Sequence, residues 1–173
     1  APDERPAVSE LQWIQHQLDN HATVAEVAEH APELLVVSVY GKVHYLVCDA
    51  GGACGAFEYL DGKLVVTTGD QLKAPALTNN SYQESAAALG KSGIPQGNGS
   101  LERFVRASRL AGELARKPGD PVEEAFSILD SVNQGEFTQW NIVYDIAGRT
   151  VHYRTRDHEQ IKRVRLDGFD PAC

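Results

Sequence analysis

The chain has 173 residues, of which 42% are hydrophobic, and 16 basic against 24 acidic side chains give it a net charge of −8. This composition is typical of a globular domain with a sizeable core, and it excludes a disordered acidic tail, a collagen-like repeat and a disulfide scaffold. No apolar run approaches the roughly 20 residues of a membrane span. An acidic chain also matches a phosphate backbone poorly, so we expect no nucleic-acid partner.

The first elements of the chain are two predicted helices with caps written into the sequence. A capping-box pattern at residues 9–12 precedes the first helix, and the same pattern at residues 23–26 precedes a second helix that Pro32 ends. The first helix carries a short apolar stripe with Trp13 beside it, formed by Leu11, Ile14 and Leu18.

Strands follow in quick succession and predict an antiparallel meander. Their ranges are 34–39, 43–48, 54–60 and 63–67, with turns at Gly41-Lys42, at residues 51–52 and at Asp61-Gly62, and a further short apolar strand is expected at residues 74–78. Cys48 and Cys54 flank the second turn, and we interpret them as two half-buried thiols, with a cross-strand disulfide as the alternative. The third cysteine, Cys173, is the last residue.

The second half of the chain predicts helices and then a second group of strands. The expected helices cover residues 83–89, 101–116 and 121–132, and the expected strands cover residues 138–145, 150–156 and 160–166. Ser100 is the expected cap of the long helix, and Asp120 with Pro121 starts the next. This order predicts an α+β fold of antiparallel sheets covered by helices, in a single domain over residues 1–173.

Two residues are candidates for a functional site. At about 100° per residue, Arg103 falls at the margin of the apolar face of its helix, while Glu102/Arg106 and Arg109/Glu113 form a solvated side. Such an arginine needs acceptors, either in a structural ion pair or in a site. Asn79 ends the apolar 74–78 segment, where its amide is either a turn residue or a donor to a developing oxyanion.

The six histidines do not predict a metal site. None of them pairs with another at i,i+4 on a helix, so we expect no metal and interpret them as solvated or strand-surface residues.

Five segments together resemble the choloylglycine hydrolase family, in the family's order along the chain. They are the central hairpin (residues 44–49 and 57–63), the "LTN" segment (ALTNN, 76–80), the "S-x-R-F" helix start (SLERFVR, 100–106), the "F-x-I-L-x-S-V" helix (AFSILDSV, 125–132) and the closing hairpin (TQWNIVYD, 138–145, and VHYRT, 151–155).

The resemblance implies an N-terminal nucleophile hydrolase of the penicillin V acylase and bile salt hydrolase type, with an αββα sandwich of antiparallel sheets. It implies hydrolysis of linear, non-peptide C–N amide bonds by an N-terminal cysteine whose own α-amino group assists proton transfer, without metal or organic cofactor. On this basis Asn79 would stabilise the oxyanion, and Arg103 would be the active-site arginine near the thiolate.

The chain departs from the family at its start, because none of its cysteines occupies the position of the nucleophile. We therefore expect the chain to be the middle and C-terminal part of a larger hydrolase domain that is incomplete here. Its partner would be a missing N-terminal segment of the same protein. By itself such a part would not hydrolyse amides. The alternatives are a non-catalytic scaffold or binding domain derived from this fold, and an unrelated α+β binding module.

The resemblance also bears on partners and location. It implies a small-molecule N-acyl amide substrate, such as penicillin V or a conjugated bile acid, and a homo-oligomer. Residues 101–173 carry 11 of the 16 basic side chains, which would suit a substrate with an acid group. The resemblance is to proteins of a bacterial type, which leaves two locations open, the periplasm and the cytoplasm.

Overall fold

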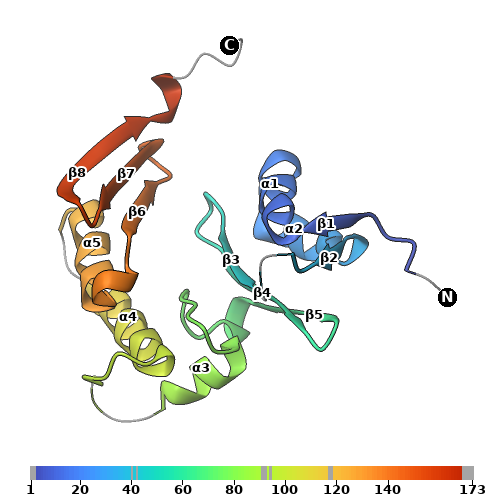
Figure 1. Ribbon diagram of the computed structural model, residues 1–173, viewed down its shortest axis with the longest axis horizontal. Helices are drawn as coiled ribbons and strands as arrows, with labels where there is room; N and C mark the ends of the chain where they lie inside the picture. Colours follow the sequence, from blue (N-terminus) through green and yellow to red (C-terminus); the bar gives the residue numbers. More distant parts are fainter. Residues whose placement is uncertain are drawn as a thin grey trace. The chain divides into compact units, whose positions relative to one another are not determined.

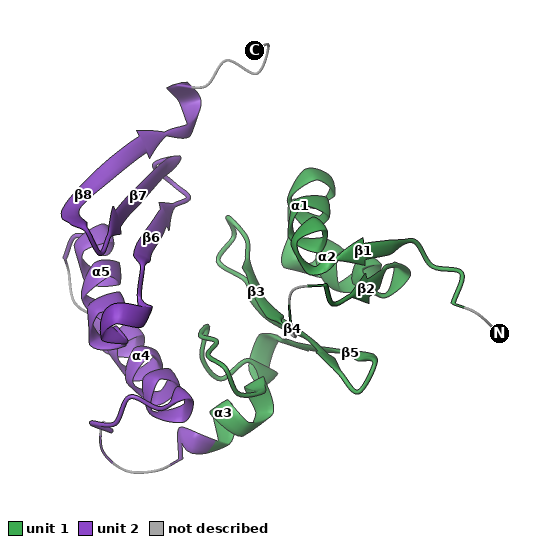
Figure 2. Cartoon of the chain, viewed as in Figure 1, with its two compact units in different colours: residues 1–87 green, residues 88–173 purple. Residues whose placement is uncertain are grey.

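The computed structural model describes residues 3–39, 41, 43–90, 93, 95–116 and 119–168. The chain divides into two compact units, unit 1 (Ala1–Ala87) and unit 2 (Ala88–Cys173), which Figure 2 distinguishes by colour. Each unit combines helices with an antiparallel three-stranded sheet (Figure 1), so the predicted α+β class is confirmed.

In the first half of the chain, α-helices lie both before and after the main sheet. In chain order the elements are β1 (Ala7–Ser9), α1 (Glu10–Asn20), α2 (Val24–His30), β2 (Leu35–Val37), β3 (His44–Cys48), β4 (Cys54–Leu60), β5 (Lys63–Thr68) and α3 (Tyr82–Ala88). Both predicted capping boxes form: the Ser9 and Thr23 side chains accept main-chain bonds at the starts of α1 and α2, and the Gln12 and Glu26 side chains reach back. These caps satisfy N–H groups that the first helical turn leaves without partners.

The buried face of α1 differs from the predicted apolar stripe. Leu11 is 60% exposed and Leu18 73%, whereas Trp13 is 1% exposed. The Trp13 ring stacks on Tyr45 at 4.1 Å and contacts Phe57 at 5.7 Å, and these large aromatic surfaces decide which face of the helix packs. Burial also raises the pKa of Tyr45 to about 12.

The main sheet of unit 1 is the predicted meander with one strand fewer. β3, β4 and β5 pair antiparallel, and the Asp61-Gly62 turn adopts the positive φ angles, 50° and 76°, of a tight hairpin. The predicted strand 34–39 was wrongly placed in this meander, because β2 instead pairs in parallel with β1. Of the expected Gly41-Lys42 turn, Lys42 lies outside the described residues.

Cys48 and Cys54 form a disulfide, so the interpretation as two thiols was wrong and the alternative holds. The two residues face one another in the register of β3 and β4, which brings their Cα atoms to 4.1 Å. The bond closes the turn between the two strands. Cys173 lies outside the described residues.

Unit 2 consists of a helix pair and a second antiparallel sheet. Its elements are α4 (Ser100–Leu114), α5 (Pro121–Ser131), β6 (Trp140–Asp145), β7 (Thr150–Thr155) and β8 (His158–Arg165). Asp120 caps α5 as predicted, but Ser100 is the first residue of α4 and Gly99 is its N-cap. Its buried apolar side chains include those of Phe104, Val105 and Phe126.

Candidate functional site

Asn79 lies in the irregular segment between β5 and α3, which Figure 1 shows in green. The strand predicted for residues 74–78 is absent from this fully described segment, so Asn79 does not end a strand. The residue is exposed, and it lines a pocket of about 540 Å³ within unit 1. The pocket has apolar walls, from Val43, Leu60 and Leu77, beside polar groups.

Two polar residues of this pocket were missed by sequence reasoning. His44 on β3 and Glu58 on β4 stand opposite one another in the sheet register, with His44 Nδ1 3.0 Å from the Glu58 carboxylate. The sequence contained a signal for this pair. If Cys48 and Cys54 face one another in the predicted hairpin, the antiparallel register also pairs residue 44 with residue 58, each four positions farther from the turn. Both side chains line the pocket that contains Asn79.

The start of α3 is held on its exposed side by Glu84. Its carboxylate accepts hydrogen bonds from the Asn80 side chain and from the hydroxyl and main-chain N–H of Ser81. These bonds favour the ionised form and hold the pKa of Glu84 below its ordinary value. The residue after Asn79 is therefore tied to the helix that follows.

Arg103 lies on α4 in unit 2 and is 7% exposed, although its guanidinium is charged. Its Nη1 donates to the main-chain carbonyl of Asn98 at 2.8 Å, in the loop that leads into the helix. The predicted position at the margin of the apolar face agrees with this burial. Since Asn79 belongs to unit 1 and Arg103 to unit 2, each residue is placed within its own unit.

The other arginines of α4 do not form the solvated side that the helical pattern predicts. Arg106 is half-buried and donates to the carbonyls of Pro95, Gly97 and Ser131 instead of pairing with Glu102. Arg109 donates to the carbonyls of Leu89 and Gly93. These side chains fasten neighbouring loops to the helix because a guanidinium offers several donors at once.

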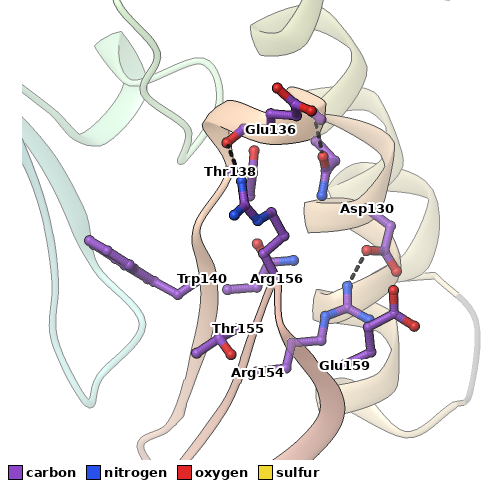
Figure 3. Close-up of a pocket in the computed structure, with 11 residues that line it drawn as sticks. Asp130, Glu136, Thr138, Trp140, Arg154, Thr155, Arg156 and Glu159 are labelled. Atoms are coloured by element: carbon purple, nitrogen blue, oxygen red, sulfur yellow. Dashed lines mark hydrogen bonds and ion pairs between the residues drawn. The ribbon is translucent and has the colours of Figure 1, made fainter.

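Unit 2 has a pocket of its own, of about 500 Å³, between the sheet and α5 (Figure 3). Arg154 on β7 pairs with Asp130 on α5 and lies over the Phe126 ring at 5.1 Å, which fastens the sheet to the helix. Arg156 reaches the main-chain carbonyl of Glu136 at the other end of the pocket. These charged groups thus engage one another or the main chain.

Neither metal nor membrane features are found in the described part of the chain. No three histidine, cysteine or carboxylate side chains come together there in a group that could hold a metal ion. None of the described helices is both long and apolar enough to cross a membrane.

Comparison with known proteins identifies relatives, although no model of a protein family matches the chain. Over 121 residues the chain is 31% identical to a penicillin V acylase of Pectobacterium atrosepticum, a match that covers 60% of this chain and 32% of that protein. Among solved structures, penicillin V acylase from Agrobacterium tumefaciens superposes with a TM-score of 0.81 and 26% identity, covering 98% of this chain and 60% of the other.

Two variants of conjugated bile acid hydrolase from Clostridium perfringens have the same fold. They superpose with TM-scores of 0.83 and 0.81 at 16% identity, covering 98% of this chain and 66% of theirs. The chain thus spans about a third of its curated relative and less than two thirds of these structures.

The likenesses confirm the expected α+β fold of the N-terminal nucleophile hydrolase type. They also show that the alternative of an unrelated binding module is wrong, because the chain is similar to penicillin V acylases both in sequence and in fold. The chain is similar in sequence to penicillin V acylases and shares its fold with a bile acid hydrolase, in agreement with the resemblance of its motifs to the choloylglycine hydrolase family.

Proposed function

We propose that the chain is part of a hydrolase that cleaves linear, non-peptide C–N amide bonds in N-acyl amides such as penicillin V or conjugated bile acids. The observation that carries the proposal is Asn79, which stands at the end of an "LTN" motif and lines a pocket with apolar walls. An apolar wall suits an acyl group, and a nearby amide N–H suits its carbonyl oxygen.

The proposed mechanism uses a cysteine at the N-terminus of the mature protein, supplied by a segment outside this chain. Its thiolate attacks the acyl carbon and forms a C–S bond, and the carbonyl oxygen becomes an oxyanion that accepts a hydrogen bond from Asn79. When the intermediate collapses, the C–N bond breaks, and the departing amine takes from the α-ammonium group the proton that the thiol had given to the α-amine. Water then hydrolyses the thioester and releases the acid.

Arg103 has the second role in this proposal. A buried cation near the nucleophile favours the thiolate over the thiol.

The alternative is a non-catalytic scaffold or binding domain derived from the same fold. The bond from Arg103 to the carbonyl of Asn98 favours it, because a purely structural arginine would make such a contact.

The experiment starts from the protein expressed from its natural coding sequence. Intact mass under denaturing conditions, with N-terminal sequencing of every species, reveals whether a polypeptide begins with cysteine. The same protein is then incubated with penicillin V and with a glycine-conjugated bile acid. A thioester on the N-terminal cysteine, with release of the amine, supports the proposal. Turnover without that adduct overturns the cysteine mechanism, and no turnover of either substrate favours the scaffold.

A further inference from the structure

Glu58 is a carboxylate buried beneath the segment that carries Asn79. It is 2% exposed in the middle of β4, and both of its oxygens accept the main-chain N–H of Tyr82, at 2.9 and 3.1 Å. His44 Nδ1 lies 3.0 Å from the same carboxylate. Because a carboxylate can only accept, this contact requires Nδ1 to carry the hydrogen.

Tyr82 joins this carboxylate to the other end of the segment. Its phenol accepts the main-chain N–H of Ala74 at 3.0 Å and donates to the Ala74 carbonyl at 3.1 Å. Residues 74–82 are therefore a loop closed at its base by one side chain, and that side chain belongs to a residue only 2% exposed. Asn79 lies between the two anchored ends.

Residues 74–80 belong to no helix or strand. Besides the Tyr82 anchor, the loop is tied to Glu84 through Asn80 and Ser81, and these anchors together hold the segment that carries Asn79. An oxyanion donor works only when it is held close to the position that the oxyanion will occupy. Buried polar groups fix such positions well, because each leaves an unsatisfied partner when it is removed.

We propose that Glu58 is the positioning residue for Asn79: its buried carboxylate fixes the Tyr82 main chain, and through it the loop that presents the Asn79 amide. The inference rests on the proposed function for the chemistry that Asn79 performs. Its mechanical part, that Glu58 holds residues 74–82 in place, depends only on the contacts within unit 1.

The test compares Glu58→Gln with Glu26→Gln in the full-length protein. The glutamine introduced at position 58 would keep the shape of the side chain. Its N–H₂ would face either His44 Nδ1 or the Tyr82 main-chain N–H, so one of these two hydrogen bonds is lost. Glu26 is a matched control, because it also accepts main-chain N–H groups in unit 1, those of Ala22 and Thr23, outside residues 74–82. Tyr82→Phe is a second, milder variant that removes the phenol bonds to Ala74.

Hydrogen exchange and kinetics are measured on all of these proteins. We expect faster exchange over residues 74–82 in Glu58→Gln and Tyr82→Phe, together with a kcat about 10- to 100-fold lower and a nearly unchanged KM. Glu26→Gln is expected to keep the kcat and the exchange of this segment, even where it lowers the melting temperature. A merely structural role for Glu58 would lower stability alone.

The outcomes separate the inference from the proposed function. An active wild type whose Glu58→Gln variant keeps its kcat, or keeps the exchange of residues 74–82, overturns the inference and leaves the function standing. A wild type without amide turnover overturns the proposed function, and with it the catalytic meaning of Glu58.

Discussion

Arg103 and Asn79 differ in how strongly their own surroundings point to a functional role. Arg103 is a charged side chain among the buried residues of α4, and that conflict is visible both in the helical pattern and in its 7% exposure. Asn79 is exposed, in a loop, and its candidacy depends on the motif around it and on the pocket that it lines. At this scale the chemistry of each residue can be tested by truncation.

Asn79→Ala should lower kcat by about 100- to 1,000-fold, because one donor to the oxyanion is lost. The melting temperature should hardly change, since the side chain is exposed. The control is Asn80→Ala, which removes a neighbouring amide that binds Glu84 and does not line the pocket. Steady-state kinetics on penicillin V compare the two variants, and equal losses of kcat would contradict the role of Asn79.

Elements of this chain are held by local contacts that respond to pH and redox conditions. The start of α2 is the clearest case, since the Glu26 carboxylate accepts the N–H groups of Ala22 and Thr23. Those two main-chain bonds, that of Ala22 first, lower the pKa of Glu26 from its ordinary value of 4.5. A depressed carboxylate pKa stabilises the fold above that ordinary value and loses its contribution as the pH falls through the folded-state pKa.

Glu26→Gln should therefore lower the melting temperature at pH 7, and the difference from wild type should shrink as the pH falls below 4.5. Circular dichroism melts from about pH 7 to about pH 3 measure this difference. Glu29→Gln, on the exposed side of the same helix, is the control and should match wild type throughout. A difference that persists unchanged in acid would contradict the proposed cause.

The disulfide between β3 and β4 should stabilise the hairpin by closing a short loop. In the chain-entropy model, a loop of this size corresponds to about 2 kcal/mol of unfolding free energy. Replacing Cys48 and Cys54 together by serine should lower the free energy of unfolding by about that amount, measured by urea denaturation. Adding a reductant to the wild type should have the same effect and should leave the double variant unchanged.

The whole molecule decides whether the arginines of α4 serve catalysis or only the fold. Arg103 and Arg106 lie one turn apart on α4, and both donate to main-chain carbonyls. Arg106 joins the loop before α4 to the end of α5, which gives it a structural role. Arg103 carries the proposed second role at the nucleophile, and only an assay of the complete protein separates the two.

Arg103→Ala should lower turnover much more than stability, whereas Arg106→Ala should lower the melting temperature and largely spare kcat. The loss of charged hydrogen bonds is expected to cost about 2 kcal/mol of stability in each case. Arg103→Lys should restore part of the turnover, because it returns the positive charge near the thiolate. An Arg103→Ala protein whose activity falls only in step with its stability would instead favour the scaffold alternative.

Local patterns in the sequence predicted most of the elements and some of the site. Both capping boxes, the Asp61-Gly62 turn, the Asp120 cap and the edge position of Arg103 depend on residues within a few positions of one another. Such contacts form wherever the surrounding chain permits. The sequence by itself therefore determined these three caps, the hairpins and the α+β class, while the family motifs pointed to Asn79 and Arg103.

The tertiary structure decided what depends on residues far apart in the chain. The aromatic stack on Tyr45 buries Trp13 in place of the leucine stripe, and β2 finds a parallel partner in β1. The contact between the Glu58 carboxylate and the Tyr82 main chain also joins residues far apart in the chain, since 24 positions separate them. The burial of a large ring and the pairing of distant strands each compete with other possible contacts. Which contact is more stable depends on the packing of the whole chain, so local sequence patterns do not decide it.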